Sequence, residues 1–193
     1  YTELSENFDA LTVTGSIPNC WSKVLSGSTL SSYATVGMYN YSSNSAPNNI
    51  SLYNAGSGSA DNMMLVSPII TNLSAGTHRL RFFAKNSPAT EDLQIGTMSN
   101  PADASTFTVL QTVDLTTSWS EYSVSFAAYT GTNTHFAFRR LSTSTYTYVY
   151  LDNVVWEAIP TTPPACVAIT SPADLAENVT SGTITCAANV DAT

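Results

Sequence analysis

Tyrosine and arginine side chains that could bind a carbohydrate occur in two parts of this sequence. Sugar-binding proteins stack a sugar ring on an aromatic side chain and hydrogen-bond its hydroxyl groups with polar side chains. The candidates are Tyr33, Tyr39, Tyr41 and Tyr53 in the polar stretch 26–59, and Arg139, Arg140, Tyr146 and Tyr148 further along the chain. The alternative is that these tyrosines pack against neighbouring strands, as most aromatic residues in β-sheets do.

Side chains suited to catalysis are sparse. A hydrolytic triad needs a nucleophile, a base and an orienting acid, and both histidines, His78 and His135, begin expected strands beside apolar runs. The sequence contains no nucleophile-elbow, zinc-protease or phosphate-loop pattern, and its three cysteines are too scattered for a zinc site. A glycosidase needs two carboxylates across a cleft, and no spacing places two together. We therefore predict that the chain is not an enzyme.

The composition narrows the class of partner. The formal net charge is −8 and the pI is about 4.4, so a nucleic acid backbone or an anionic membrane surface would be repelled. No apolar run reaches the roughly 18 residues that a membrane span needs, and we expect no membrane insertion. Only 10% of the residues are charged. Chains rich in Ser, Thr, Asn and Tyr are typical of secreted β-proteins, so we predict an extracellular or cell-surface location.

The cysteines and the ends of the chain indicate an excised module. Three cysteines, Cys20, Cys166 and Cys186, leave at least one unpaired in a monomer, and Cys166 and Cys186 could form a disulfide. No disulfide can hold the N-terminal domain together. No signal peptide is visible, so we interpret the chain as a mature or excised fragment that is monomeric.

The elements that must position the candidate residues are short strands. Strict alternation of apolar and polar residues occurs in 77–84, 119–126, 135–139 and 145–151. In the first segment Leu80, Phe82 and Ala84 fall on one face, and in the last Tyr146 and Tyr148 share a face with Tyr150. Such alternation gives one buried and one exposed face, which indicates an all-β fold with antiparallel sheets packed as a sandwich. We expect all three tryptophans, Trp21, Trp119 and Trp156, in the core.

The chain divides into a domain, a linker and a fragment. Residues 1–159 form one block of expected strands and Gly/Ser/Asn turns, and 160–165 (PTTPPA) form a proline-rich linker. Residues 166–193 begin a second β-segment, and 28 residues are too few to bury a core alone.

Short motifs in residues 1–159 follow a recognisable order. They are LSENFD (4–9), IPNCW (17–21), DNMMLVSPII (61–70), LRFFA (80–84), FAFR (136–139) and YLDNV (150–154). This order resembles the cleaved-adhesin domains of gingipain-type bacterial adhesins and, more distantly, the MAM domains of animal cell-surface proteins. Residues 163–181 look like the opening of a fibronectin-type-III-like domain, but the expected core Trp is missing and Cys186 lies near its place.

The resemblance implies a jelly-roll β-sandwich, export to the cell surface or beyond, and a structural Ca²⁺ site without a catalytic centre. Ca²⁺ binds six to eight oxygen atoms from carboxylates, carbonyls and water. The family's ligands fall on Asp9, Asp61 and Asp152, with Glu6 as a substitute for Asp9, and Asn62 and Asn153 as additional oxygen donors. The alternative is that Asp61 and Asp152 cap turns.

We conclude from the sequence that the chain is a non-catalytic accessory module of a larger secreted protein. It would bind a carbohydrate or a cell surface. The alternative is a structural spacer or a protein-interaction domain of an adhesin or secreted protease, and a glycan-active enzyme of jelly-roll type is the third hypothesis.

Overall fold

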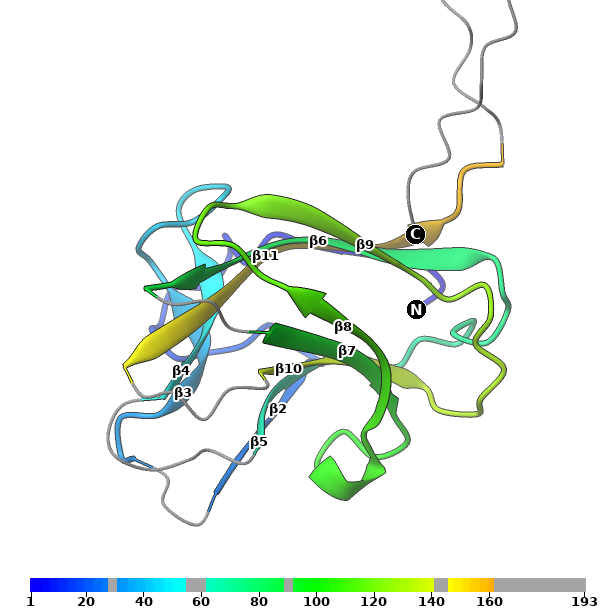
Figure 1. Ribbon diagram of the computed structural model, residues 1–193, viewed down its shortest axis with the longest axis horizontal. Coiled ribbons are helices and arrows are strands. Elements are labelled where there is room, and N and C mark those ends of the chain that lie inside the picture. Colours follow the sequence, from blue (N-terminus) through cyan, green and yellow to red (C-terminus); the bar gives the residue numbers. More distant parts are fainter. Residues whose placement is uncertain (28–30, 55–61, 89–91, 141–145, 162–193) are drawn as a thin grey trace, which may run out of the picture.

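A computed structural model describes residues 1–27, 31–54, 62–88, 92–140 and 146–161. These residues form two antiparallel sheets packed face to face, which confirms the predicted all-β sandwich (Figure 1). The six-stranded sheet contains β1 (Leu4–Glu6), β3 (Thr35–Tyr39), β4 (Asn49–Asn54), β6 (His78–Ser87), β9 (Ser120–Ser125) and β11 (Thr147–Ala158). The five-stranded sheet contains β2 (Ser22–Ser26), β5 (Asn62–Val66), β7 (Asp92–Met98), β8 (Thr108–Asp114) and β10 (His135–Arg140).

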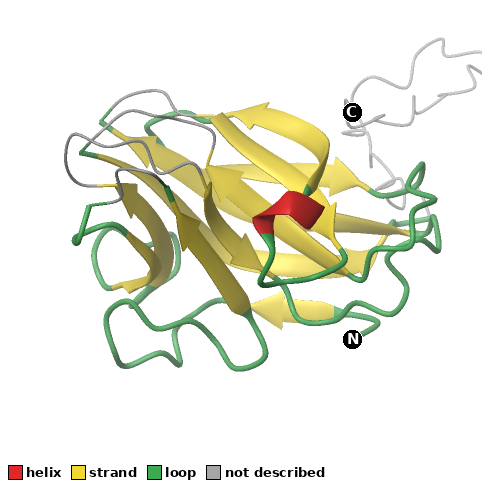
Figure 2. Cartoon of the chain, turned by 90° about the horizontal axis from the view of Figure 1, so that it is seen from below, coloured by secondary structure: helices red, strands yellow, loops and turns green. Residues whose placement is uncertain are grey.

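The chain crosses repeatedly between the two sheets. The strand orders are β3-β4-β11-β6-β9 and β2-β5-β10-β7-β8, with β1 also paired to β11. Consecutive strands β9, β10 and β11 alternate between the sheets, as the jelly-roll prediction requires. One short 3-10 helix, η1 (Ala104–Thr106), is the only helix among the described residues (Figure 2). No helix in this part of the chain is long and apolar enough to span a membrane.

Strand β11 changes partner along its length. Residues Thr147–Leu151 pair with β4, whereas Val154–Trp156 pair with β1. Between these stretches the register with β6 shifts after Asp152, and Asn153 has a φ of 48°. A β-bulge inserts one extra residue and bends the strand, so the bulge reverses which residues of β11 face inward.

The core lies between the sheets and is rich in aromatic residues. The predicted inward face of β6 is confirmed, since Leu80, Phe82 and Ala84 are buried. Trp156 is buried against Phe126, with ring centroids 4.9 Å apart in an edge-to-face arrangement. Its indole N–H donates to Asn72 Oδ1 at 3.0 Å, so the polar atom of this core tryptophan is satisfied.

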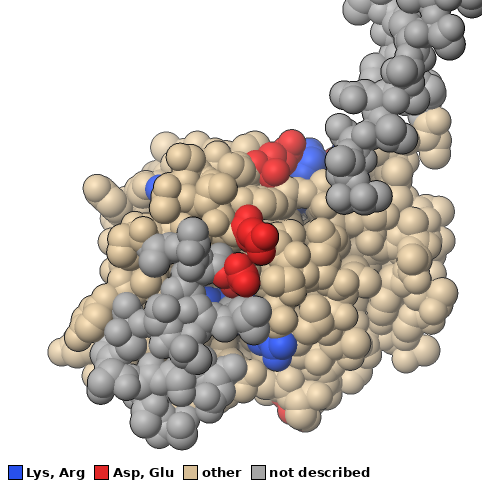
Figure 3. All heavy atoms as spheres, in the orientation of Figure 1, with Lys and Arg blue, Asp and Glu red and all other residues tan. Residues whose placement is uncertain are grey.

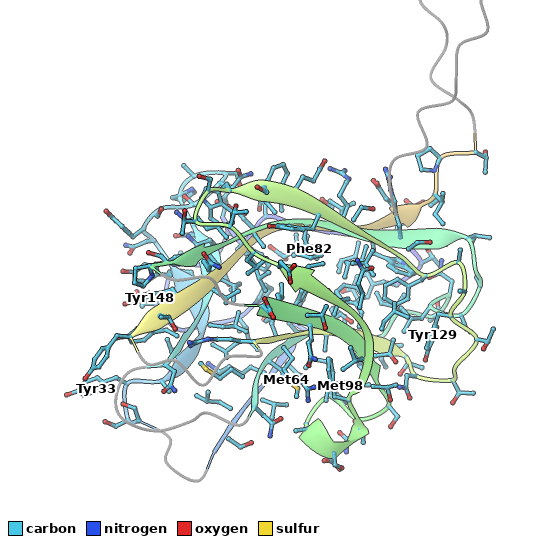
Figure 4. All side chains as sticks on the ribbon, viewed as in Figure 1. Tyr33, Met64, Phe82, Met98, Tyr129 and Tyr148 are labelled. Carbon is cyan, nitrogen blue, oxygen red and sulfur yellow. The ribbon has the colours of Figure 1, made fainter. Side chains whose placement is uncertain are left out.

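A second apolar cluster lies on the outer face of the five-stranded sheet. It contains Val24, Met64, Val66, Met98 and Ala137, with Phe107 and Ala104 packed against it. Figure 4 labels Met64 and Met98 on this sheet. The segment around η1 therefore covers part of an outer face that would otherwise expose apolar side chains.

Two of the three tryptophans lie in the core. Trp21 and Trp156 are buried as predicted, but Trp119 is only partly buried and lies on the outside of the six-stranded sheet, so its placement in the core was wrong. Trp119 precedes β9, and its N–H donates to Ser42 O at 2.9 Å.

Cys20 is exposed with a free thiol. Most of the linker, the predicted C-terminal segment 166–193 and its two cysteines lie outside the described residues.

Replacing Trp156 by Phe should lower the free energy of unfolding by about 2 kcal/mol or more. The change removes buried apolar contact and leaves Asn72 Oδ1 without its indole donor. Trp119→Phe is the matched control and should cost less than about 1 kcal/mol, because Trp119 lies at the surface. Urea unfolding followed by circular dichroism measures both, and equal losses would contradict this description of the core.

Candidate functional site

Four tyrosines lie together on the outer face of the six-stranded sheet. Tyr53 of β4 lies directly opposite Tyr148 of β11, and Tyr150 follows two residues later on the same face. Tyr39 ends β3, next to β4. Their neighbours along each strand, such as Ile50 and Leu52, face the core, so alternation sends the tyrosines outward.

The tyrosine rings stack on one another. The centroids of Tyr53 and Tyr148 are 4.1 Å apart, and those of Tyr148 and Tyr150 are 5.3 Å apart with an interplanar angle of 4°. Tyr39 stacks at about the same angle on both Tyr148 and Tyr150, at 5.9 and 6.0 Å. Stacking occupies much of the ring faces within the protein.

Tyr41 offers the most accessible ring of the group. It packs edge-on against Tyr39 at 6.3 Å, and 69% of its surface is exposed. We call Tyr39, Tyr41, Tyr53, Tyr148 and Tyr150 the tyrosine surface. Figure 4 shows Tyr148 at the end of the molecule where β3 and β4 lie.

A lysine and a tryptophan extend the tyrosine surface. Lys85 of β6 lies over the rings of both Tyr150 and Trp119, 5.3 Å from each centroid, and donates to Ser42 Oγ. Burial lowers the pKa of Lys85. Two aromatic faces and a hydroxyl group contact the ammonium, and these contacts partly offset the cost of burying its charge.

Two phenol groups of the surface are held in the neutral form by their surroundings. Burial, with a hydrogen bond between Tyr148 and Tyr53 as the next cause, raises the pKa of Tyr148 to about 12. Burial also raises the pKa of Tyr150. Neutral phenols both donate and accept hydrogen bonds, so the surface combines apolar rings with hydroxyl groups.

Asp152 holds the segment that carries Tyr41 against the sheet. Its Oδ2 accepts the backbone N–H groups of Asn44 and Ser45 at 2.8 and 2.9 Å. Its Oδ1 accepts the Ser45 hydroxyl at 3.3 Å and the Asn153 N–H at 2.8 Å. The side chain is fully buried, and burial raises the pKa of this carboxyl against the opposing effect of its donors.

The other sugar-binding candidates lie away from the tyrosine surface. Arg140 is 2% exposed, and its guanidinium contacts Met63 Sδ and Thr147 Oγ1 inside the sandwich, so it is not available to a ligand at the surface. Its side chain faces inward from β10, as do the side chains of Phe136 and Phe138. Arg139 faces outward from the five-stranded sheet. Tyr146 is 66% exposed but makes no ring contact among the described residues, and Tyr33 points into solvent (Figure 4).

Sequence reasoning missed three members of the site. Tyr150 was placed on the same face as Tyr148 but was not a candidate, although the alternation already carried the signal. Trp119 was assigned to the core because tryptophan is usually buried. Lys85 gave no signal, because its contact with Ser42 joins residues 43 positions apart.

The predicted calcium ligands are engaged in hydrogen bonds within the protein. Asp9 accepts from Asn7 Nδ2 and from the N–H of Asn48, and Glu6 Oε1 accepts the N–H of Phe8 at 2.7 Å. Asn153 Oδ1 accepts the Ser45 hydroxyl. Asp61 lies outside the described residues, and Asn62 donates to Ser26. The described residues contain no group of three acidic, histidine or cysteine side chains placed to hold a metal ion.

Comparison with known proteins gives matches at the level of structure. No family model matches the sequence, and no curated protein matches it. The K2 cleaved adhesin domain of Lys-gingipain matches with a TM-score of 0.62 and 14% identity, over 80% of this chain and 99% of that domain. The K3 cleaved adhesin domain of Lys-gingipain from Porphyromonas gingivalis w83 matches with a TM-score of 0.55 and 20% identity, over 79% of this chain and 95% of that domain. A family 29 carbohydrate-binding module matches with a TM-score of 0.51 and 14% identity, over 81% of this chain and 92% of that module. At these identities the matches show a shared β-sandwich fold.

Replacing Asp152 by Ala should lower the free energy of unfolding by roughly 2–3 kcal/mol, because its buried donors lose a charged acceptor. The amides of Asn44 and Ser45 should also exchange with solvent faster. Hydrogen exchange by NMR, in buffer with EDTA, measures the second effect.

The matched control is Asp103→Ala. Asp103 also accepts a backbone N–H and a hydroxyl, both from Ser105, but it is exposed. This variant should leave the exchange of Asn44 and Ser45 unchanged. Unchanged exchange in the Asp152 variant would show that the carboxylate does not hold this segment.

Proposed function

We propose that the chain is a non-catalytic binding module of a larger secreted protein, and that its ligand is a glycan bound at the tyrosine surface. The observation that carries this proposal is the gathering of Tyr39, Tyr41, Tyr53 and Tyr148 from three strands and a loop on one outer face. Three of these side chains stack together, and Tyr41 remains largely exposed.

The chemistry of the surface suits sugars. A sugar ring presents an apolar face and a rim of hydroxyl groups, and an exposed tyrosine ring with neighbouring phenols complements both. Figure 3 shows few charged side chains on the face it displays, in keeping with the low charge of the whole chain. Apart from the ammonium of Lys85, the tyrosine surface is uncharged, so a ligand that binds there desolvates little charge.

The structural neighbours support the same class of function. They include a carbohydrate-binding module and adhesin domains, which are proteins that bind and do not catalyse. We also propose that the chain acts outside the cell or at its surface, where its partner is a glycan or a cell-surface protein. As a single module the chain would bind weakly, and neighbouring modules would add avidity.

The first experiment is a glycan array with the full chain, followed by titration of the best polysaccharide. Tyr41→Ala should weaken binding by about tenfold or more, because it removes an exposed ring worth about 1.4 kcal/mol. Tyr148→Ala should weaken it further by disturbing the stack. Tyr33→Ala is the control, since Tyr33 is 76% exposed but lies outside the tyrosine surface.

Two results would argue against the proposal. Absence of selective binding on the array would favour the structural spacer or protein-interaction alternative. Equal losses in the Tyr33 and Tyr41 variants would place the sugar elsewhere. Release of reducing sugars from a polysaccharide would favour an enzyme instead.

The structural Ca²⁺ ion implied by the adhesin resemblance remains a prediction, with Glu6, Asp9, Asp61 and Asp152 as its candidate ligands. Thermal unfolding in Ca²⁺ and in EDTA tests it. A ligand that binds only the native state at about 100 times its Kd adds roughly 2.7 kcal/mol to stability. We expect a higher unfolding midpoint with Ca²⁺, reduced in Asp9→Ala. An unchanged midpoint in metal-free protein would leave these carboxylates as hydrogen-bond acceptors only.

A further inference from the structure

Arg139 occupies a position unlike that of the other basic residues. It projects from β10 on the outer face of the five-stranded sheet, between Met64 of β5 and Gln94 of β7. The tyrosine surface belongs to the other sheet. A ligand held by Arg139 would therefore occupy a second, separate site.

The guanidinium of Arg139 is fixed in one orientation. Its Nε donates to Gln94 Oε1 at 2.8 Å, and its Nη2 donates to the same oxygen. Its Cζ lies over the ring of Phe107, 4.3 Å from the ring centroid. Phe107 can approach because Gly96 has no side chain, and a Cβ there would lie 2.6 Å from the ring. A guanidinium held in this way loses little entropy when it binds a ligand.

Arg139 has no carboxylate partner among the described residues. By contrast, Arg79 and Arg81 both pair with Glu157, and Lys23 donates to two backbone carbonyls. Partial burial lowers the pKa of Arg139, which remains a cation because arginine is always protonated in proteins. A partly desolvated guanidinium with unused N–H donors is a strong binder of planar anions, above all carboxylates.

The neighbouring side chains restrict the kind of anion. Asp92 of β7 and Asp114 of β8 lie directly opposite each other, and alternation places both on the same outer face as Gln94. Their negative charges oppose every anion, and they oppose a doubly charged phosphate or a polyanion more strongly than a single carboxylate. The same carboxylates accept hydrogen bonds from hydroxyl groups. A sugar with a single carboxylate among its hydroxyl groups would fit this site, because the carboxylate would bind the guanidinium of Arg139 and the hydroxyl groups would donate to Asp92 and Asp114.

From this arrangement we propose that Arg139 forms a second binding site, which takes the carboxylate of a uronic acid residue in a glycan. The guanidinium binds the carboxylate through its free N–H groups, and Asp92 and Asp114 accept the sugar hydroxyls. The site requires no residue of the tyrosine surface.

The test compares two sugars that differ only at C6, methyl β-D-glucuronide and methyl β-D-glucoside. Titration of the ¹⁵N-labelled full chain by NMR should shift the amides of Gln94 and Phe107 with the glucuronide. Affinity for the glucuronide should exceed that for the glucoside by about tenfold or more, as for a charge-assisted bidentate pair. Added salt should reduce this preference.

Arg139→Met is the decisive variant, because methionine keeps an apolar chain over Met64 and removes the charge. The glucuronide preference should fall to about one while the unfolding midpoint stays near that of the wild type. Arg139→Lys keeps the charge without the planar fork and should retain only part of the preference. Tyr148→Ala should leave it intact, so this site and the tyrosine surface can fail independently.

Equal binding of the two sugars by the wild type would overturn the proposal, as would no binding at all. A preference that survives in Arg139→Met would place the carboxylate elsewhere. A preference lost equally in Tyr148→Ala would show that the two surfaces are one site.

Discussion

The buried carboxylate of Asp152 is the interaction on which the outer face of the six-stranded sheet depends. It sits at the bulge of β11 and accepts donors from a segment 107 and 108 residues earlier in the chain, as well as from its own neighbour Asn153. A buried carboxylate is costly unless hydrogen bonds compensate it, and here four donors do so. The same contacts fix the 44–45 turn, and the preceding residues Tyr41 and Ser42 then meet Tyr39, Lys85 and Trp119.

The bulge also explains how one strand serves two purposes. Without an extra residue, alternation would place Tyr148, Tyr150 and Trp156 on the same face. The register shift after Asp152 inverts the pattern, so the tyrosines face outward and Trp156 enters the core. The bulge also lies between the part of β11 that pairs with β4 and the part that pairs with β1. A local backbone irregularity thus separates the structural end of β11 from the end that forms the tyrosine surface.

The sequence predicted the parts of this arrangement that depend on local periodicity. The strands at 77–84 and 135–139, the shared face of Tyr148 and Tyr150, and the buried Trp156 all follow from alternation and apolar character. No local pattern predicts the bulge, the contact of Lys85 with two rings, or the hydrogen bonds that Asp152 accepts from residues 44 and 45. These features join residues that are far apart in the sequence. Trp119 illustrates the limit, because residue type predicted burial while its position before an edge strand placed it outside.

Arg139 and Arg140 show how strongly the two-residue period governs chemistry in this fold. They are adjacent and identical in type, yet Arg140 faces inward beside Thr147, and Arg139 faces outward over Phe107. The inward arginine is tolerable because this end of the sandwich also buries the polar side chains Asn54 and Asn86, so the interior there is not a purely apolar medium. The outward arginine meets a neutral amide oxygen and an aromatic face, which orient it without neutralising its charge. Orientation without neutralisation distinguishes a cation that can bind a ligand from one that only stabilises the fold.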